Sequence, residues 1–74
     1  MIFEVYGIPS GEDDVTYQQD IPLLLEDLKV IMSWKEDREC AGDYWLTAQQ
    51  ISDIQKKCSF ELPVELDLYL SNHQ

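Results

Sequence analysis

The sequence predicts a small α+β domain in which one layer of helices packs on a single-layer sheet. Three patterns indicate this class. A run of β-branched and aromatic residues occupies 1–8, apolar residues recur at helical spacing over about 20–34 and 47–58, and apolar residues alternate with polar ones over 64–70. With 74 residues, the chain is expected to form one domain, 1–74, and is too short for a second.

The first third of the chain predicts a strand, a loop and the start of a helix. Residues 1–8, MIFEVYGI, have the composition of a strand, and glycine and proline end the run. Residues 9–20 are polar and predict a loop. We expect Asp20 to cap a helix over about 20–34, with Pro22 in the first turn, where its missing N–H costs nothing.

The middle of the chain predicts a short strand followed by a capped helix. The charged segment 35–43 ends in a turn signal, and the apolar residues that follow predict a strand near 43–46. Thr47 and Gln50 have the spacing of a capping box, in which each side chain binds the backbone N–H of the other residue. They predict that the second helix begins here and continues over 47–58.

The C-terminal segment allows two structures. From Phe60 to Leu70 every second residue is apolar, which favours a half-buried strand near 64–70. Pro63 lacks the N–H that a strand needs, and it would also suit the first turn of a helix. A helix would expose Val64 and Leu68, and leaving such a side chain in water forgoes about 1.5–3 kcal/mol. We therefore favour the strand and keep the helix as the alternative.

The charge of the chain restricts the partners that it can bind. Fifteen acidic and five basic residues give a formal charge of −10. Such a surface repels the phosphates of nucleic acids and of anionic membranes, so direct binding to either is not expected. A basic protein, above all a nucleic-acid-binding protein or complex, is the natural partner. The acidic residues form three clusters: Glu12, Asp13 and Asp14; Glu36, Asp37, Glu39 and Asp43; and Glu61, Glu65 and Asp67. All of them except Glu61 are expected to contact the partner.

The adjacent aromatic residues Tyr44 and Trp45 are a second binding signal. Tyrosine and tryptophan often anchor protein interfaces, and they are equally common in cores. We expect Tyr44 to be exposed and to contact the partner, and Trp45 to belong to the core. Tyr17 is also expected to be exposed, whereas Trp34 follows the apolar stripe of the first helix and is expected to be buried.

The sequence lacks the residue patterns of a catalytic or cofactor site, so we expect neither enzyme activity nor a cofactor. His73 is the only histidine and lies beside the C-terminus, a position that usually frays. Asp37 and Glu39 could share a weakly bound cation, but a solvated acidic surface is the simpler interpretation, and no metal site is expected. Cys40 and Cys58 are expected to be free thiols.

The protein is expected to act in the cytoplasm, which would be that of a host cell if a phage encodes it. The first residues become acidic at once and lack the basic region of a signal peptide. No apolar run approaches the roughly 18 residues that a membrane span needs.

Part of the chain resembles a known family. Residues 46–70 combine a capped helix, a short linker and the pair Leu62-Pro63 before a second apolar segment. The residues concerned are Leu46, Thr47, Ile51, Lys57, Glu61, Leu62, Pro63, Val64, Glu65, Leu66, Tyr69 and Leu70. This pattern resembles a signature of the SMI1/KNR4 family, which includes bacterial immunity proteins that neutralise toxins, often nucleases, by binding them. The resemblance implies a helix from Pro63 onward and a role in blocking another protein.

Size, charge and the missing catalytic residues together predict a small acidic inhibitor that binds the basic, nucleic-acid-handling surface of a protein partner. Its carboxylates would take the place of phosphates, as in a nucleic-acid mimic. A phage-encoded antagonist of host defence, directed against restriction or CRISPR machinery, fits this description. Two alternatives stay open: an immunity or antitoxin-like protein that neutralises a toxin, and a small subunit or adaptor of a larger assembly.

Overall fold

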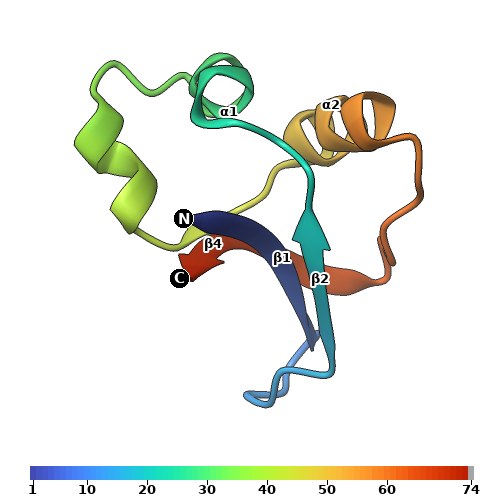
Figure 1. The fold of residues 1–74 in the computed structure, drawn as a ribbon. Helices are drawn as coiled ribbons and strands as arrows, with labels where there is room; N and C mark the ends of the chain where they lie inside the picture. Colours follow the sequence, from blue (N-terminus) through green and yellow to red (C-terminus); the bar gives the residue numbers. More distant parts are fainter. Residues whose placement is uncertain (74) are drawn as a thin grey trace.

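The computed structural model describes residues 1–73 and has the α+β architecture that the sequence predicts. Four antiparallel strands form one sheet in the order β2-β1-β4-β3. The elements, in chain order, are β1 (Ile2–Pro9), β2 (Tyr17–Ile21), α1 (Leu25–Met32), the 3₁₀-helix η1 (Asp37–Ala41), β3 (Tyr44–Trp45), α2 (Ala48–Cys58) and β4 (Leu66–His73) (Figure 1).

Both α-helices lie on the same side of the sheet (Figure 1). The core between the two layers draws on all of the longer elements, since Val5 of β1, Leu28 of α1, Ile54 of α2 and Leu68 of β4 are almost fully buried. Trp34, which follows α1, is buried in the same core, as predicted. Within residues 1–73 no helix covers the other side of the sheet (Figure 1), so the side chains there form an outer surface.

The register of the two central strands decides which side chains face the core. Val5 pairs with Leu70, and Tyr6 pairs with Tyr69, across β1 and β4. Successive side chains of a strand point to opposite faces of the sheet. Val5 and Leu70, which are buried, therefore point toward the helices, and Tyr6 and Tyr69 point away from them.

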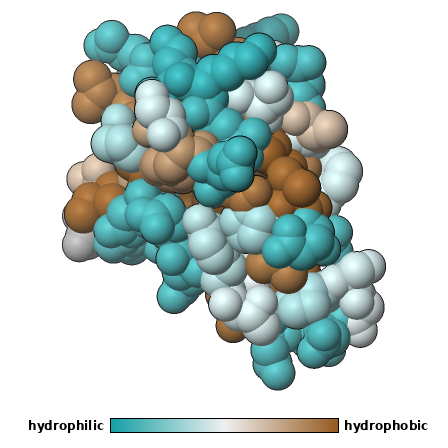
Figure 2. All heavy atoms as spheres, turned by 90° about the vertical axis from the view of Figure 1, so that its right-hand side faces the viewer, coloured by the Kyte–Doolittle hydropathy of each residue, from teal (hydrophilic) through white to brown (hydrophobic). Residues whose placement is uncertain are grey.

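The expected loop over 9–20 ends earlier than predicted, because Tyr17–Ile21 forms strand β2 against β1. Ile21 is the only buried residue of this edge strand, and its three central residues are exposed. Because β2 lacks alternating apolar and polar residues, its sequence does not predict a strand. The turn between β1 and β2 forms the lower end of the molecule, which Figure 2 shows to be mainly hydrophilic.

Helix α1 is shorter than the predicted 20–34, and Asp20 is not its cap. The N-cap is Leu24, whose backbone N–H donates to Oδ2 of Asp27 at 3.1 Å. Leu24 has no side-chain acceptor for the N–H groups of the first turn, so the hydrogen bond to Asp27 is the side-chain contact that holds this end of the helix. Asp20 belongs to β2, and Pro22 follows this strand outside the helix.

Helix α2 and strand β3 lie where the sequence predicts them. Oγ1 of Thr47 accepts the backbone N–H of Gln50 at 3.2 Å, and Oε1 of Gln50 accepts the N–H of Thr47 at 2.9 Å, which completes the predicted capping box. Cys58, the last residue of α2, and Cys40 of η1 are free thiols. Neither α2 nor any other helix within residues 1–73 has the length and apolar character needed to cross a membrane.

The C-terminal segment forms strand β4, as favoured over the helix. The strand starts three residues after Pro63, and the N–H of Leu66 donates to the carbonyl of Pro63 at 3.1 Å in the preceding turn. The helix from Pro63 that the family resemblance implies is therefore wrong. The packing argument for the strand holds only in part, because Leu68 is buried but Val64 is 67% exposed in the turn.

Candidate functional site

The uncovered side of the sheet carries mainly polar and aromatic side chains, with two isoleucines of β1 among them, and we call this surface the open face. Its members are assigned from the alternation of the strands and the pairing of their residues. They are Ile2, Glu4, Tyr6 and Ile8 of β1, Gln18 and Asp20 of β2, Trp45 of β3, and Asp67, Tyr69, Ser71 and His73 of β4.

A row of aromatic side chains crosses the open face. Tyr6 of β1 lies opposite Tyr69 of β4, and their rings stack with centroids 5.1 Å apart and planes 12° apart. Trp45 of β3 lies opposite Tyr69 on its other side. Trp45 is 58% exposed, so this aromatic row of three residues ends in a large side chain that is accessible to a partner.

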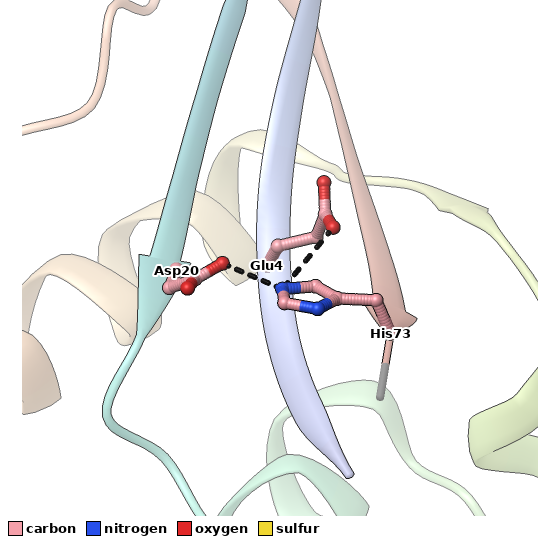
Figure 3. Close-up of side chains that lie close together, drawn as sticks. All are labelled: Glu4, Asp20 and His73. Atoms are coloured by element: carbon pink, nitrogen blue, oxygen red, sulfur yellow. Dashed lines mark hydrogen bonds and ion pairs between the residues drawn. The ribbon is translucent and has the colours of Figure 1, made fainter.

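An imidazole and two carboxylates meet at one end of the open face. Figure 3 shows His73, Asp20 and Glu4 pointing toward one another from three adjacent strands. Nε2 of His73 lies 2.8 Å from Oδ1 of Asp20 and 3.6 Å from Oε1 of Glu4. We expected a fraying position for His73, but it is the last residue of β4 and pairs with Ile2. The sequence did not single out this group, because 53 residues separate Asp20 from His73.

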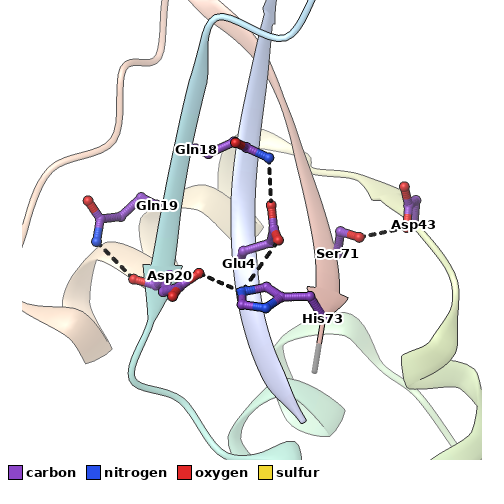
Figure 4. A network of polar contacts seen from close by, with 7 residues as sticks. All are labelled: Glu4, Gln18, Gln19, Asp20, Asp43, Ser71 and His73. Carbon is purple, nitrogen blue, oxygen red and sulfur yellow. Dashed lines mark hydrogen bonds and ion pairs between the residues drawn. The ribbon is translucent and has the colours of Figure 1, made fainter.

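An acidic row, consisting of Asp20, Glu4 and Asp43, runs beside the aromatic row. Glu4 lies opposite Asp20 on one side and opposite Ser71 on the other. The hydroxyl of Ser71 donates to Oδ1 of Asp43 at 2.8 Å, which extends the row beyond β4 (Figure 4). The hydroxyl of Tyr6 donates to Oδ2 of Asp43 at 3.1 Å and joins the acidic row to the aromatic row.

The carboxylates of the acidic row favour the protonated forms of their neighbours. Burial, the hydrogen bond to Asp43 and the charge of Asp43 raise the pKa of Tyr6 above its ordinary value of 10.0. The hydrogen bond to Asp20 raises the pKa of His73 above its ordinary value of 6.5. At neutral pH the hydroxyl of Tyr6 is therefore a donor, and the orientation of Asp43 is maintained by two hydroxyl groups.

The positive charges of the chain lie away from the strands of the open face. All five lysines and arginines fall between residues 29 and 57, in or beside α1, η1 and α2. Residues 1–21 and 65–73 contain seven acidic residues and no lysine or arginine, so they contribute −7 of the formal charge of −10. These two stretches include β1, β2 and β4. The net negative charge is therefore concentrated on the strands β1, β2 and β4 and on the turns at their ends rather than on the helices.

Two of the predicted acidic clusters lie at one end of β1. Residues Glu12, Asp13 and Asp14 are exposed in the turn that follows this strand. The last residue of β1 pairs with the first residue of β4, which brings Glu65 and Asp67 to the same end. Asp67 lies on the open face, whereas Glu65 lies in the turn one residue before the strand. Glu65 and Asp67 therefore do not project side by side from one face of a strand.

All four carboxylates of the third predicted cluster have partners within the molecule, and those of Asp43 are the hydroxyl groups of Tyr6 and Ser71. Asp37 forms an ion pair with Lys29 at 2.8 Å, and Glu36 forms one with Arg38 at 2.8 Å. Glu39 accepts two backbone N–H groups at 2.8 and 2.6 Å, and these hydrogen bonds lower its pKa. The side chains of Asp37 and Glu36 stay 74% and 60% exposed and remain accessible to a partner, whereas Glu39 holds the backbone at the start of η1.

The structure reverses the expected roles of Tyr44 and Trp45. Tyr44 is half-buried on the core side of β3, where its hydroxyl donates to the carbonyl of Glu39 at 2.6 Å. Its ring lies 5.3 Å from that of Trp34 between centroids. Trp45, predicted as a core residue, is exposed, and Tyr17, predicted as exposed, is half-buried. A strand of two residues offers no alternation from which its faces could be assigned.

Known proteins add nothing to this description of the chain. Comparisons with protein-family models, with curated proteins and with solved structures give no match. The functional argument therefore depends on the geometry and charge of the open face.

Proposed function

We propose that the protein is a small acidic inhibitor that binds the basic, nucleic-acid-handling surface of a protein partner through its open face. The observation that carries this proposal is an acidic row beside an aromatic row on a face without lysine or arginine. Inhibition would follow from occupancy, because the partner cannot hold its nucleic acid and this protein on the same surface. The proposed place of action is the cytoplasm, where such a partner would meet it.

The two rows are complementary to the guanidinium groups of a basic surface. Carboxylates accept hydrogen bonds from the paired N–H groups of arginine, and the flat guanidinium group stacks on aromatic rings. A single arginine of the partner could bind Asp43 and stack on Trp45 or Tyr69. Lysine offers a point charge without the flat surface, so a partner rich in arginine fits better than one rich in lysine.

The spacing of the carboxylates supports competition with nucleic acid. Directly paired residues of neighbouring strands, such as Glu4 and Asp20, have Cβ atoms about 4.5–5.5 Å apart. Phosphates of one nucleic-acid strand rise by about 3.4 Å per nucleotide and lie further apart through space.

The negative charge also attracts a basic partner before contact, which speeds association at low salt.

The exposure of Trp45 favours a second candidate function, that of an immunity or antitoxin-like protein that neutralises a toxin. Such a protein would depend on a central aromatic anchor more than on charge. In that case Trp45→Ala would remove binding, whereas neutralising the open-face carboxylates would change it little. An inhibitor that mimics nucleic acid would instead lose affinity with either change.

The proposal is tested by immobilising the full chain and passing an extract of its native host over it at low and at high salt. Retained proteins are identified by mass spectrometry. We expect a basic nucleic-acid-binding protein that is retained at low salt and is released by added DNA or RNA. Salt should also release it, because the attraction between the two charged surfaces is screened.

Two charge-matched variants separate the open face from the net charge. Asp43→Asn with Asp67→Asn removes two charges from the sheet side, and Glu26→Gln with Asp53→Asn removes two from the helices. We expect only the first variant to lose the partner. Retention of the partner by that variant, or binding that is indifferent to salt and to nucleic acid, would contradict the proposal.

A further inference from the structure

We infer that Glu4, Asp20 and His73 form a binding site for a divalent transition-metal ion such as Zn²⁺ at one end of the open face. The site consists of three side chains on the adjacent strands β1, β2 and β4, with one donor atom from each. It does not depend on the proposed partner, because it is argued from the geometry of these side chains alone.

The donor set favours a transition metal over Ca²⁺ or Mg²⁺. Zn²⁺ accepts imidazole nitrogen together with carboxylate oxygen, whereas Ca²⁺ and Mg²⁺ are bound almost entirely by oxygen. His73 supplies the nitrogen, and Glu4 and Asp20 supply oxygens. Two carboxylates and one neutral imidazole also balance the double positive charge of the ion.

The distances between the donor atoms are close to those around a single ion, and the shortest of them, 2.8 Å, would have to widen by about 0.5 Å to hold one. Ligand atoms lie about 2.0–2.2 Å from Zn²⁺, so two ligands of a tetrahedral ion are about 3.3–3.6 Å apart. Nε2 of His73 lies 2.8 Å from Oδ1 of Asp20 and 3.6 Å from Oε1 of Glu4. All three donors lie within 4.8 Å of one another. Small rotations of the side chains therefore suffice to surround an ion.

The sheet fixes the relative positions of the three ligands. Glu4 pairs directly with Asp20 across β1 and β2. His73 pairs with Ile2, so it lies on the same face one diagonal step from Glu4. Because backbone hydrogen bonds hold all three strands, binding does not have to order a loop, and the site is largely formed in advance.

A neighbouring glutamine orients one of the ligands (Figure 4). The side-chain amide of Gln18 donates to Oε2 of Glu4 at 3.4 Å, which leaves Oε1 on the side of His73. The side chain of Gln19 donates to the backbone carbonyl of Asp20 at 3.0 Å. A hydrogen bond to a ligating side chain, such as that from Gln18 to Glu4, commonly fixes the geometry of a metal site. The same five residues line a shallow polar hollow that is open to solvent, so an ion can enter it.

Binding exchanges a proton for the ion. Nε2 of His73 is within hydrogen-bond distance of Asp20, and a metal ligand must present a lone pair at this atom. The ion therefore takes the place of the proton between His73 and Asp20, and the proton leaves to solvent. Three protein ligands leave a fourth tetrahedral position for water or for a group of another molecule.

The test is a titration of the metal-free full chain with Zn²⁺ alone. Calorimetry measures the affinity and stoichiometry, and ¹⁵N NMR follows the ring nitrogens of the single histidine. We expect one ion per chain and a large change in the shift of Nε2 of His73. His73→Gln and Asp20→Asn should each weaken binding by at least about tenfold.

Two control variants and a competing ion test whether Zn²⁺ binds instead to other carboxylates or to a thiol. Asp13→Asn removes a charge from the β1–β2 turn, and Cys40→Ser removes a thiol; both should keep the affinity within about twofold. Excess Mg²⁺ should not displace Zn²⁺. The inference is overturned by an absence of binding at millimolar Zn²⁺, by equal affinity in His73→Gln, by loss of binding in Cys40→Ser, or by displacement with Mg²⁺. Because Asp20 and His73 are exposed, their variants should keep the fold, which circular dichroism checks.

Discussion

At the scale of single residues, Gly7 shows how tightly the two central strands pack under the helices. It pairs with Leu68 across β1 and β4 and lies on the face that points into the core. A Cβ atom at this position would stand 2.8 Å from Cδ1 of Leu66 and 3.1 Å from Cδ2 of Leu68. The space that a methyl group would need is therefore already filled by the two leucines.

Gly7→Ala is expected to lower the free energy of unfolding by about 1–3 kcal/mol, because an added group in a filled core displaces its neighbours. Urea denaturation followed by circular dichroism measures this change. Ser10→Ala, in the exposed turn after β1, is the control and should change stability by less than about 0.5 kcal/mol. Equal stability of Gly7→Ala and the natural chain would show that the leucines do not fill this space.

The two tryptophans make a second comparison at this scale, because one is buried and the other exposed. Trp34→Ala should lower the free energy of unfolding by about 3–5 kcal/mol, since it empties a large volume in the core. Trp45→Ala should lower it by about 1 kcal/mol or less and should mainly weaken partner binding. Thermal and urea denaturation of both variants test whether Trp34→Ala is the more destabilising change. A Trp45→Ala variant that loses as much stability as Trp34→Ala would contradict this prediction.

At the scale of elements, the short helix η1 depends on one carboxylate. Oε2 of Glu39 accepts the backbone N–H of Glu36 at 2.8 Å and that of Lys35 at 2.6 Å. These bonds favour the charged form and lower the pKa of Glu39 below its ordinary value of 4.5. The stabilisation from Glu39 is therefore fully present above 4.5 and is lost as the pH falls through the lowered pKa of the folded state.

Glu39→Gln removes the charge but keeps an oxygen that can accept both N–H groups. The difference in unfolding free energy between the natural chain and this variant should be largest at neutral pH and should shrink in acid. Denaturant titrations at several pH values on either side of 4.5 measure it. A difference that stays constant with pH would mean that the charge of Glu39 has no part in holding η1.

The elements differ in how far the sequence alone could predict them. Helix α2 follows from the local pair Thr47 and Gln50, and β1 follows from its composition, so both were predicted correctly. Strand β2 has solvent-facing residues at its centre and exists because β1 offers an edge to pair with, which is a tertiary effect. For the same reason α1 was predicted to start too early, since Asp20 resembles a helix cap when its pairing with Glu4 is unknown.

The sequence predicts which types of residue the candidate site contains, but not which of them lie together. The excess of carboxylates is visible in the composition, and Asp43 and Asp67 were expected to contact a partner. Which carboxylates share a face depends on the register of β1 with β2 and β4, which no local pattern encodes. The ion pairs of Glu36 with Arg38 and of Asp37 with Lys29 are more local, since they join residues two and eight positions apart.

At the scale of the whole molecule, the uncompensated negative charges on the sheet repel one another and should lower the free energy of unfolding, although the proposed function uses the same charges. Asp67→Asn removes one such charge and is expected to raise the free energy of unfolding at low salt. The gain should disappear at high salt, where charges further apart than a few Å are screened. Asp37→Asn, which breaks the ion pair with Lys29, is the matched control and should give no gain. Denaturant titrations at low and high salt decide between these outcomes, and a loss of stability in Asp67→Asn at low salt would contradict the expected repulsion.

The central claim is that a basic partner binds the open face and not the helices. Its most direct test is a ¹H–¹⁵N NMR titration of the full chain with an arginine-rich, nucleic-acid-binding peptide. The predicted result is that the largest shifts occur at Tyr6, Tyr69 and the indole N–H of Trp45, and that added DNA reverses them by competing for the peptide. Shifts concentrated on α1 and α2, or spread evenly over all acidic residues, would contradict the claim.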